Sequence, residues 1–208
     1  MSKTAFAARC TAVTIGTVLL VGVAGVAMAE EVNHGDQDVA VNVAITEITQ
    51  PGVLAMSVAG TTTTLTEDGS TPTIRQFTGA LPTVTVTDTR TPDEIPDDAA
   101  WYVLGTSTDF TGSTGQTPIS AAHLGWTPDL IDGGDSGQVA EGDQVDTILD
   151  TGANAVGLVD QELLAMAYNS GDIATEGQWT ATANLFLRTP ATTTPGDYTA
   201  NLTLSLFE

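Results

Sequence analysis

The segment WTATANLFL, from Trp179 to Leu187, decides the fold class of this chain. Apolar residues recur at every second position, which is the period of a strand with one buried face, whereas helical spacing would be three or four. The segment from Tyr198 to Leu206 repeats the pattern after a stretch rich in Pro and Thr, residues 189–196. These two strands are predicted either to form a hairpin or to bridge two sheets.

Further strands are predicted upstream at short and roughly regular intervals. Alternating or Thr-rich apolar stretches lie at 39–45, 52–66, 81–88 and 101–110, with turn residues between them. The stretch 160–168 lacks a clean helical stripe and is predicted as strand, with one short helix there as the alternative. The chain is therefore predicted to be all-β, an antiparallel β-sandwich of the immunoglobulin-like kind.

The first 29 residues have the three parts of a secretory signal peptide. Lys3 and Arg9 precede a short apolar run, and the run ends at a small-x-small cleavage site, Ala27-Met28-Ala29. We therefore expect a secreted protein whose mature chain, residues 30–208, forms a single domain. No other apolar segment approaches twenty residues, so no membrane span is expected after cleavage.

Charge narrows the range of partners. Cleavage leaves three arginines, 26 acidic residues and no lysine or cysteine, a formal net charge of −23. Such a field repels the phosphate backbone, so no nucleic acid is expected as a partner. Without cysteine the domain must be stable without disulfides, which its size permits.

Three short motifs match catalytic signatures, but their context argues against an enzyme. His123 and Ser136 stand in segments similar to those of serine proteases, yet only twelve residues separate them. That is too few for the two barrels that bring nucleophile and base together. Asp150-Thr151-Gly152 matches the aspartic-protease triplet, but that chemistry needs two carboxylates and the chain has one copy. No catalytic residue and no cofactor are predicted.

An acidic, glycine-rich loop holds the leading candidates for a metal site. Asp132, Asp135, Glu141 and Asp143 could offer the carboxylate oxygens that calcium takes. Their spacing is not that of an EF-hand, and a solvated, self-repelling loop explains them as well. No metal is predicted, with calcium at these four residues as the alternative.

The C-terminal half, roughly residues 81–208, resembles the WxL-domain surface proteins of Gram-positive bacteria. The residues that carry the resemblance are Trp101-Tyr102-Val103-Leu104, Asp109-Phe110-Thr111-Gly112, Ile119 to Trp126-Thr127-Pro128, and Pro195 to Leu206. Leu204 stands where the family usually has its second signature tryptophan. The resemblance implies a secreted β-sandwich that associates non-covalently with the cell wall, through peptidoglycan or a wall-bound partner protein.

Trp101, Leu104 and Trp126 are the candidate binding residues under this resemblance. An exposed indole ring stacks on sugars, and the alternative is that both tryptophans fill the sandwich core. The leading prediction is a secreted, non-enzymatic cell-surface adhesion domain that binds a cell-wall glycan or a wall-bound surface protein. The alternative is a self-associating subunit of an extracellular fibre or biofilm matrix, in which the strand Val39–Ile48 completes a neighbour's sheet edge.

Overall fold

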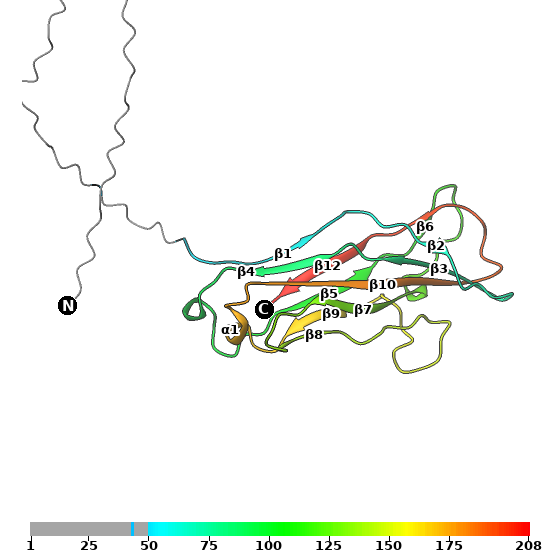
Figure 1. Ribbon diagram of the computed structural model, residues 1–208. Helices are drawn as coiled ribbons and strands as arrows, with labels where there is room; N and C mark the ends of the chain where they lie inside the picture. The colour runs from blue at the N-terminus through cyan, green and yellow to red at the C-terminus, as the bar shows by residue number, and fades with distance from the viewer. Residues whose placement is uncertain (1–42, 44–49) are drawn as a thin grey trace, which may run out of the picture. The chain divides into compact units, whose positions relative to one another are not determined.

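Antiparallel strands dominate the fold, which the computed structural model describes at Val43 and over residues 50–208 (Figure 1). The predicted all-β class and the sandwich-like arrangement are confirmed. The signal peptide predicted at 1–29 lies outside the described residues, as does the predicted strand 39–45 apart from Val43. No helix within the described residues is long and apolar enough to cross a membrane.

The larger sheet contains six strands. They are β1 (Leu54–Val58), β2 (Thr66–Glu67), β3 (Ile74–Ala80), β4 (Val84–Asp88), β7 (Leu124–Asp132) and β10 (Gln178–Pro190). The 13-residue β10 organises this sheet. It pairs along one edge with β4 and then β3, and along the other edge with β7. Outside these neighbours, β1 pairs with β4 and β2 pairs with β3.

The smaller sheet contains four strands in the order β12-β5-β9-β8. They are β5 (Tyr102–Ser107), β8 (Val139–Glu141), β9 (Glu162–Ala167) and β12 (Leu202–Phe207). A separate pair of two-residue strands is formed by β6 (Thr111–Gly112) and β11 (Tyr198–Thr199). The two alternating C-terminal segments therefore bridge the two sheets, as β10 and β12, and the hairpin alternative is wrong.

Helical turns in the described chain are short. They are the 3₁₀ turns η1 (Pro92–Glu94) and η2 (Ala121–His123) and the α-helix α1 (Ser170–Ile173). The predicted strand within 160–168 is confirmed as β9, and the alternative of a helix there is wrong. The helix begins after β9 because the Asn169 side chain accepts hydrogen bonds from the backbone N–H groups of Gly171 and Asp172.

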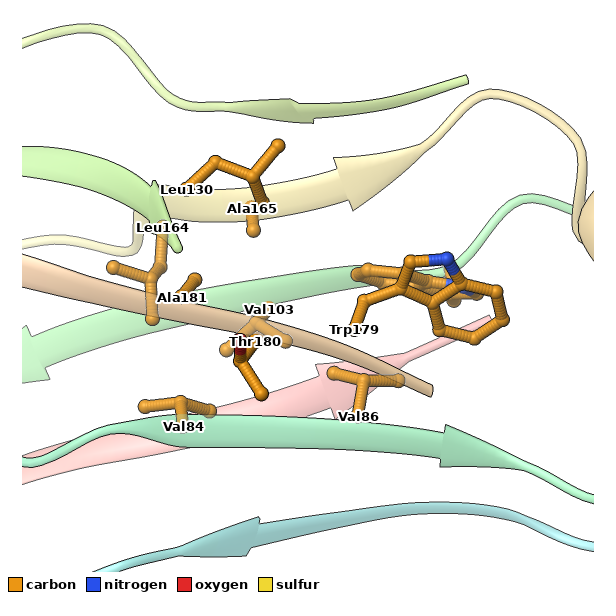
Figure 2. Close-up of a pocket in the computed structure, with 10 residues that line it drawn as sticks. Val84, Val86, Val103, Leu130, Leu164, Ala165, Trp179, Thr180 and Ala181 are labelled. Carbon is orange, nitrogen blue, oxygen red and sulfur yellow. The ribbon is translucent and has the colours of Figure 1, made fainter. Parts of the chain in front are cut away.

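Three tryptophans form the centre of the core: Trp126 on β7, Trp179 on β10, and Trp101, which immediately precedes β5. Trp101 and Trp179 lie with ring centroids 5.4 Å apart at 42°, a tilted aromatic pair. Trp179 also borders a gap of about 10 Å³, which is lined mostly by apolar side chains of both sheets. Figure 2 shows the side chains that surround it. Such a gap holds at most one water and offers it few polar partners, so the centre of the sandwich is closed to ligands.

Candidate functional site

An apolar groove opens between the two sheets at one end of the sandwich. Leu185 and Leu187, near the end of β10, are buried at its floor, while Phe77 of β3 and Leu202 and Leu204 of β12 line it with partly exposed side chains. The groove has a volume of about 910 Å³. That is within the range of natural ligand sites, and it is the candidate site of the described chain.

Partial burial of the last strand marks the groove. Alternation predicts Leu202 and Leu204 on the buried face of that strand and Thr203 on the opposite face. The register is confirmed, because both leucines pack against the core and Thr203 is exposed. Both leucines nevertheless remain half-buried, since no strand within residues 50–208 covers them from the groove side.

Threonine-rich loops form the rim of the groove. One is Thr61–Thr64, which follows β1, and the other contains Thr194, which precedes β11. The hydroxyl of Thr63 donates to the carbonyl of Ala80 at 2.7 Å, and the hydroxyl of Tyr198 donates to the carbonyl of Thr194 at 2.7 Å. Each loop is therefore held to the fold by a side-chain hydrogen bond, and Thr61, Thr62, Thr64 and Thr194 are exposed.

Arg75 and Asp197 are the charged residues among those that line the groove. Arg75 is already engaged: its Nη2 lies 2.7 Å from Oε2 of Glu67, and its guanidinium carbon lies 5.0 Å from the centroid of the Phe77 ring. The hydrogen bond from Arg75, followed by one from Ser70, lowers the pKa of Glu67 to about 2. The groove itself is therefore nearly free of uncompensated charge, in contrast to the acidic chain as a whole.

Two strand edges border the groove. Among the described strands, β12 pairs only with β5 and β1 only with β4, so each has one edge without a strand partner. Met56 and Val58 of β1 also line the groove. An unpaired edge offers a row of N–H and C=O groups to an incoming strand. This groove therefore combines apolar walls with backbone groups that can receive an extended peptide.

The opposite end of the sandwich is closed by Arg90, which follows β4. Its guanidinium contacts the buried carboxylate of Asp88 at 2.7 Å and the carboxylate of Glu208, just after β12, at 2.6 Å. The ion pairs of Arg90 with Asp88 and Glu208 thus connect the two sheets at this end. The described chain also enters here, because the carbonyl of Val53 accepts from the N–H of Thr89. Figure 1 places this end at the left and the β2–β6 end at the right.

The predicted binding residues do not form an exposed surface. Trp101 and Trp126 are 1% and 0% exposed, so their indole rings are core residues that no sugar can reach in this structure. Leu104 lies half-buried on β5, next to the inward-facing Val103. A Cβ on Gly105 would lie 2.5 Å from Cη2 of Trp126, which shows how closely β5 packs on that ring.

The catalytic motifs are separated or occupied by structural contacts. His123 and Ser136 lie beyond opposite ends of the nine-residue β7, which spans about 30 Å. Asp150 accepts a 2.7 Å hydrogen bond from the hydroxyl of Thr147 and pairs with Arg188. Burial raises the pKa of Asp150, but the bonds from Thr147 and the charge of Arg188 outweigh it, and the pKa is lowered. This carboxylate serves the loop's structure.

The calcium candidates do not converge either. Over residues 50–208, no three His, Cys, Asp or Glu side chains lie close enough together to hold a metal ion. This applies to the four candidates Asp132, Asp135, Glu141 and Asp143 as well. Asp132 instead accepts a 3.0 Å hydrogen bond from the N–H of Gly134. Glu176 organises the same loop by accepting from the N–H of Ser136 at 2.8 Å and from the indole N–H of Trp179 at 2.9 Å.

Sequence reasoning did not find the groove, although two signals pointed near it. The run Thr61–Thr64 forms part of its rim, and the leucines of β12 form one wall. No protein-family model, curated protein or solved structure matches this chain. The resemblance to WxL-domain proteins therefore rests on the sequence motifs and stays a prediction.

Proposed function

We propose that this chain is a secreted, non-enzymatic protein of the cell surface that binds an extended segment of a protein partner in its groove. One observation supports the proposal: the groove has an apolar floor and walls, and two strand edges without a partner among the described strands lie beside it. An added strand would bond its backbone to such an edge and direct alternate side chains into the groove.

The groove also favours protein over glycan among the predicted cell-wall partners. Its buried lining is mostly leucine, isoleucine and phenylalanine, with Thr189 as a buried hydroxyl residue, whereas most of its other threonines belong to exposed loops. A polysaccharide would leave its own hydroxyls unpaired against such a floor, which is unfavourable. A wall-bound surface protein is therefore the partner class that we assign to this site, and the cell surface or cell wall is its location.

The absence of cysteine from the mature chain allows a direct binding test. An environment-sensitive fluorophore is attached to Thr62→Cys on the groove rim, and in a matched variant to Thr203→Cys on the outward face of β12. The probes are an uncharged peptide of alternating Val and Thr, a peptide of the same composition in blocks, and purified peptidoglycan sacculi. We expect the alternating peptide to shift emission of the rim label and to leave the outward label unchanged.

Two results of this binding test would contradict the assignment of the groove as a peptide site. One is sedimentation with sacculi while no peptide changes the rim label, which would assign the protein to glycan binding. The other is an equal response of the two labels, which would place peptide binding away from the groove. Hydrolysis of either peptide or of the sacculi by the purified protein would contradict the non-enzymatic assignment.

A further inference from the structure

We infer that the occupant of the groove is the segment Val39–Ile45 of a second copy, so that the protein assembles head to tail by strand donation. This inference rests on the proposed function, because it takes the groove to be a site for an extended protein segment. The protein partner of the groove is then a second copy of the same chain.

The sequence of the donor segment matches the groove in chemistry. Val39, Val41, Val43 and Ile45 occupy alternate positions, and no residue from 39 to 46 is charged. In a strand, these four side chains share one face and can enter the apolar groove together. With a mature charge of −23, two copies repel each other at long range, so an uncharged segment is a suitable part of one copy to enter another.

The length of the segment also matches its acceptor. The donor pattern spans seven residues, and β12, whose outer edge is unpaired among the described strands, spans six residues from Leu202 to Phe207. The half-buried Leu202 and Leu204 lie along this edge. Strand addition there would cover the two leucines and extend the smaller sheet by one strand.

The entry point of the chain favours a neighbour as acceptor over the same copy. The N–H of Gly52 donates to Oε1 of Glu94 at 3.3 Å, which holds the chain at the end of the sandwich that Arg90 closes. A fold-back onto the groove would require the chain to reverse its direction within residues 46–51 and to run back alongside its own β1 (Leu54–Val58). Donation to a neighbour needs no reversal and yields a linear chain, because the donor leaves one end and the groove opens at the other.

The central experiment compares two doubly substituted mature chains that carry the same added charge. Val41→Asp with Val43→Asp places the charges on the apolar face, and Asn42→Asp with Ala44→Asp places them on the opposite face. Sedimentation velocity over a concentration series is the measurement. We expect the unmodified chain and the control to form growing assemblies, and the first variant to need at least ~100-fold higher concentration. Thermal melting by circular dichroism verifies that all three chains are folded.

Disulfide trapping tests which copy receives the donor. One chain carries Asn42→Cys and a second carries Thr62→Cys on the rim; in the control pair the rim residue is replaced by Asp172→Cys on α1, at the opposite end of the sandwich. Mild oxidation should give the mixed dimer with Thr62→Cys and not with Asp172→Cys. A chain that carries both Asn42→Cys and Thr62→Cys and closes an internal disulfide at high dilution, without forming dimers, would overturn assembly between copies.

The inference and the proposed function can fail separately. A synthetic peptide of residues 38–47 is added to the Val41→Asp, Val43→Asp chain labelled at Thr62→Cys. If the peptide shifts the label while the unmodified chain stays monomeric at every concentration, the inference is overturned and peptide binding in the groove stands. If neither this peptide nor the alternating Val and Thr peptide shifts the label, both are overturned.

Discussion

Arg90 and Glu208, 118 positions apart in the chain, join the two sheets through a bidentate ion pair. Nη1 and Nη2 of Arg90 lie 2.8 Å and 2.6 Å from the two carboxylate oxygens of Glu208, and the same guanidinium contacts Asp88. The Asp88 side chain is 0% exposed, and Arg90 is the cation that contacts its buried carboxylate. The end opposite the groove is therefore held by one arginine that serves two sheets.

Arg90→Met should destabilise the protein by about 3–5 kcal/mol, because it leaves the buried carboxylate of Asp88 without a counter-charge. Arg75→Met is the matched control: it removes the solvent-exposed pair with Glu67 and should change stability far less. Urea unfolding of both variants measures the difference. Equal losses would contradict the structural role assigned to Arg90.

Gly105 packs so closely on Trp126 that any side chain at this position should disturb the centre of the core. Gly105→Ala should destabilise the protein by about 1–3 kcal/mol, because the new methyl group overlaps the six-membered ring of Trp126. Trp126→Phe shortens that ring, so the double variant should lose less than the sum of the single losses. Urea unfolding of the four chains completes the cycle. Additive losses would mean that the two residues are not in contact.

The alternation in the last two segments was enough to predict both strands and their buried faces, because period two is a local property of the backbone. It could not predict which sheet each strand joins. The sheet that each strand joins depends on its pairing partners, which are β3, β4 and β7 for β10, and β5 for β12. These partners are distant in sequence from the strands they pair with. Likewise, large apolar area makes Trp101 suitable for either a core or a sugar-binding face, and only the packing around it decides.

The groove was outside the reach of sequence reasoning for the same reason. Its walls come from segments more than a hundred positions apart, such as Leu65 and Leu204. Each wall taken alone reads as an ordinary half-buried strand or a polar loop. The helix α1 illustrates the local limit, since one turn after Asn169 is too short to show a helical stripe.

Low pH should weaken the contribution of Glu67. Its pKa is lowered from 4.5 to about 2, so its stabilising effect is complete above pH 4.5 and is lost as pH falls towards 2. The unfolding midpoint of Glu67→Gln should therefore lie below that of the unmodified chain by a constant margin above pH 5. The margin should shrink between pH 4.5 and 2. A margin that does not change with pH would contradict the lowered pKa.

Glu162 supplies a control of opposite sign. Burial and the neighbouring charge of Asp160 raise its pKa, so its ionised form is less favourable in the folded chain than in the unfolded chain. Glu162→Gln should therefore stabilise the protein at pH 7, and the gain should disappear as pH falls below the ordinary pKa of 4.5. Urea midpoints measured at pH 3 and pH 7 check the sign.

Secretion predicts a defined N-terminus. The site Ala27-Met28-Ala29 after the short apolar run should be cleaved, so protein from the culture or wall fraction should begin at Glu30. Intact-mass spectrometry measures this directly. Retention of Met1 in the mature protein would contradict both the signal peptide and the charge of −23 that follows from its removal.

That charge should make stability depend on ionic strength. In the described chain, Arg75, Arg90 and Arg188 each already pair with a carboxylate, so most acidic residues have no cationic partner and repel one another. Raising salt from 0.01 M to 0.15 M shortens the screening length from about 30 Å to about 8 Å and should raise the melting temperature.

Sodium and calcium at matched ionic strength should act alike, because Asp132 and its acidic neighbours form no converging metal group in residues 50–208. Thermal melts in low salt, sodium and calcium separate the cases. No change with either salt would contradict the repulsion, whereas a gain with calcium alone that Asp132→Asn abolishes would establish a calcium site.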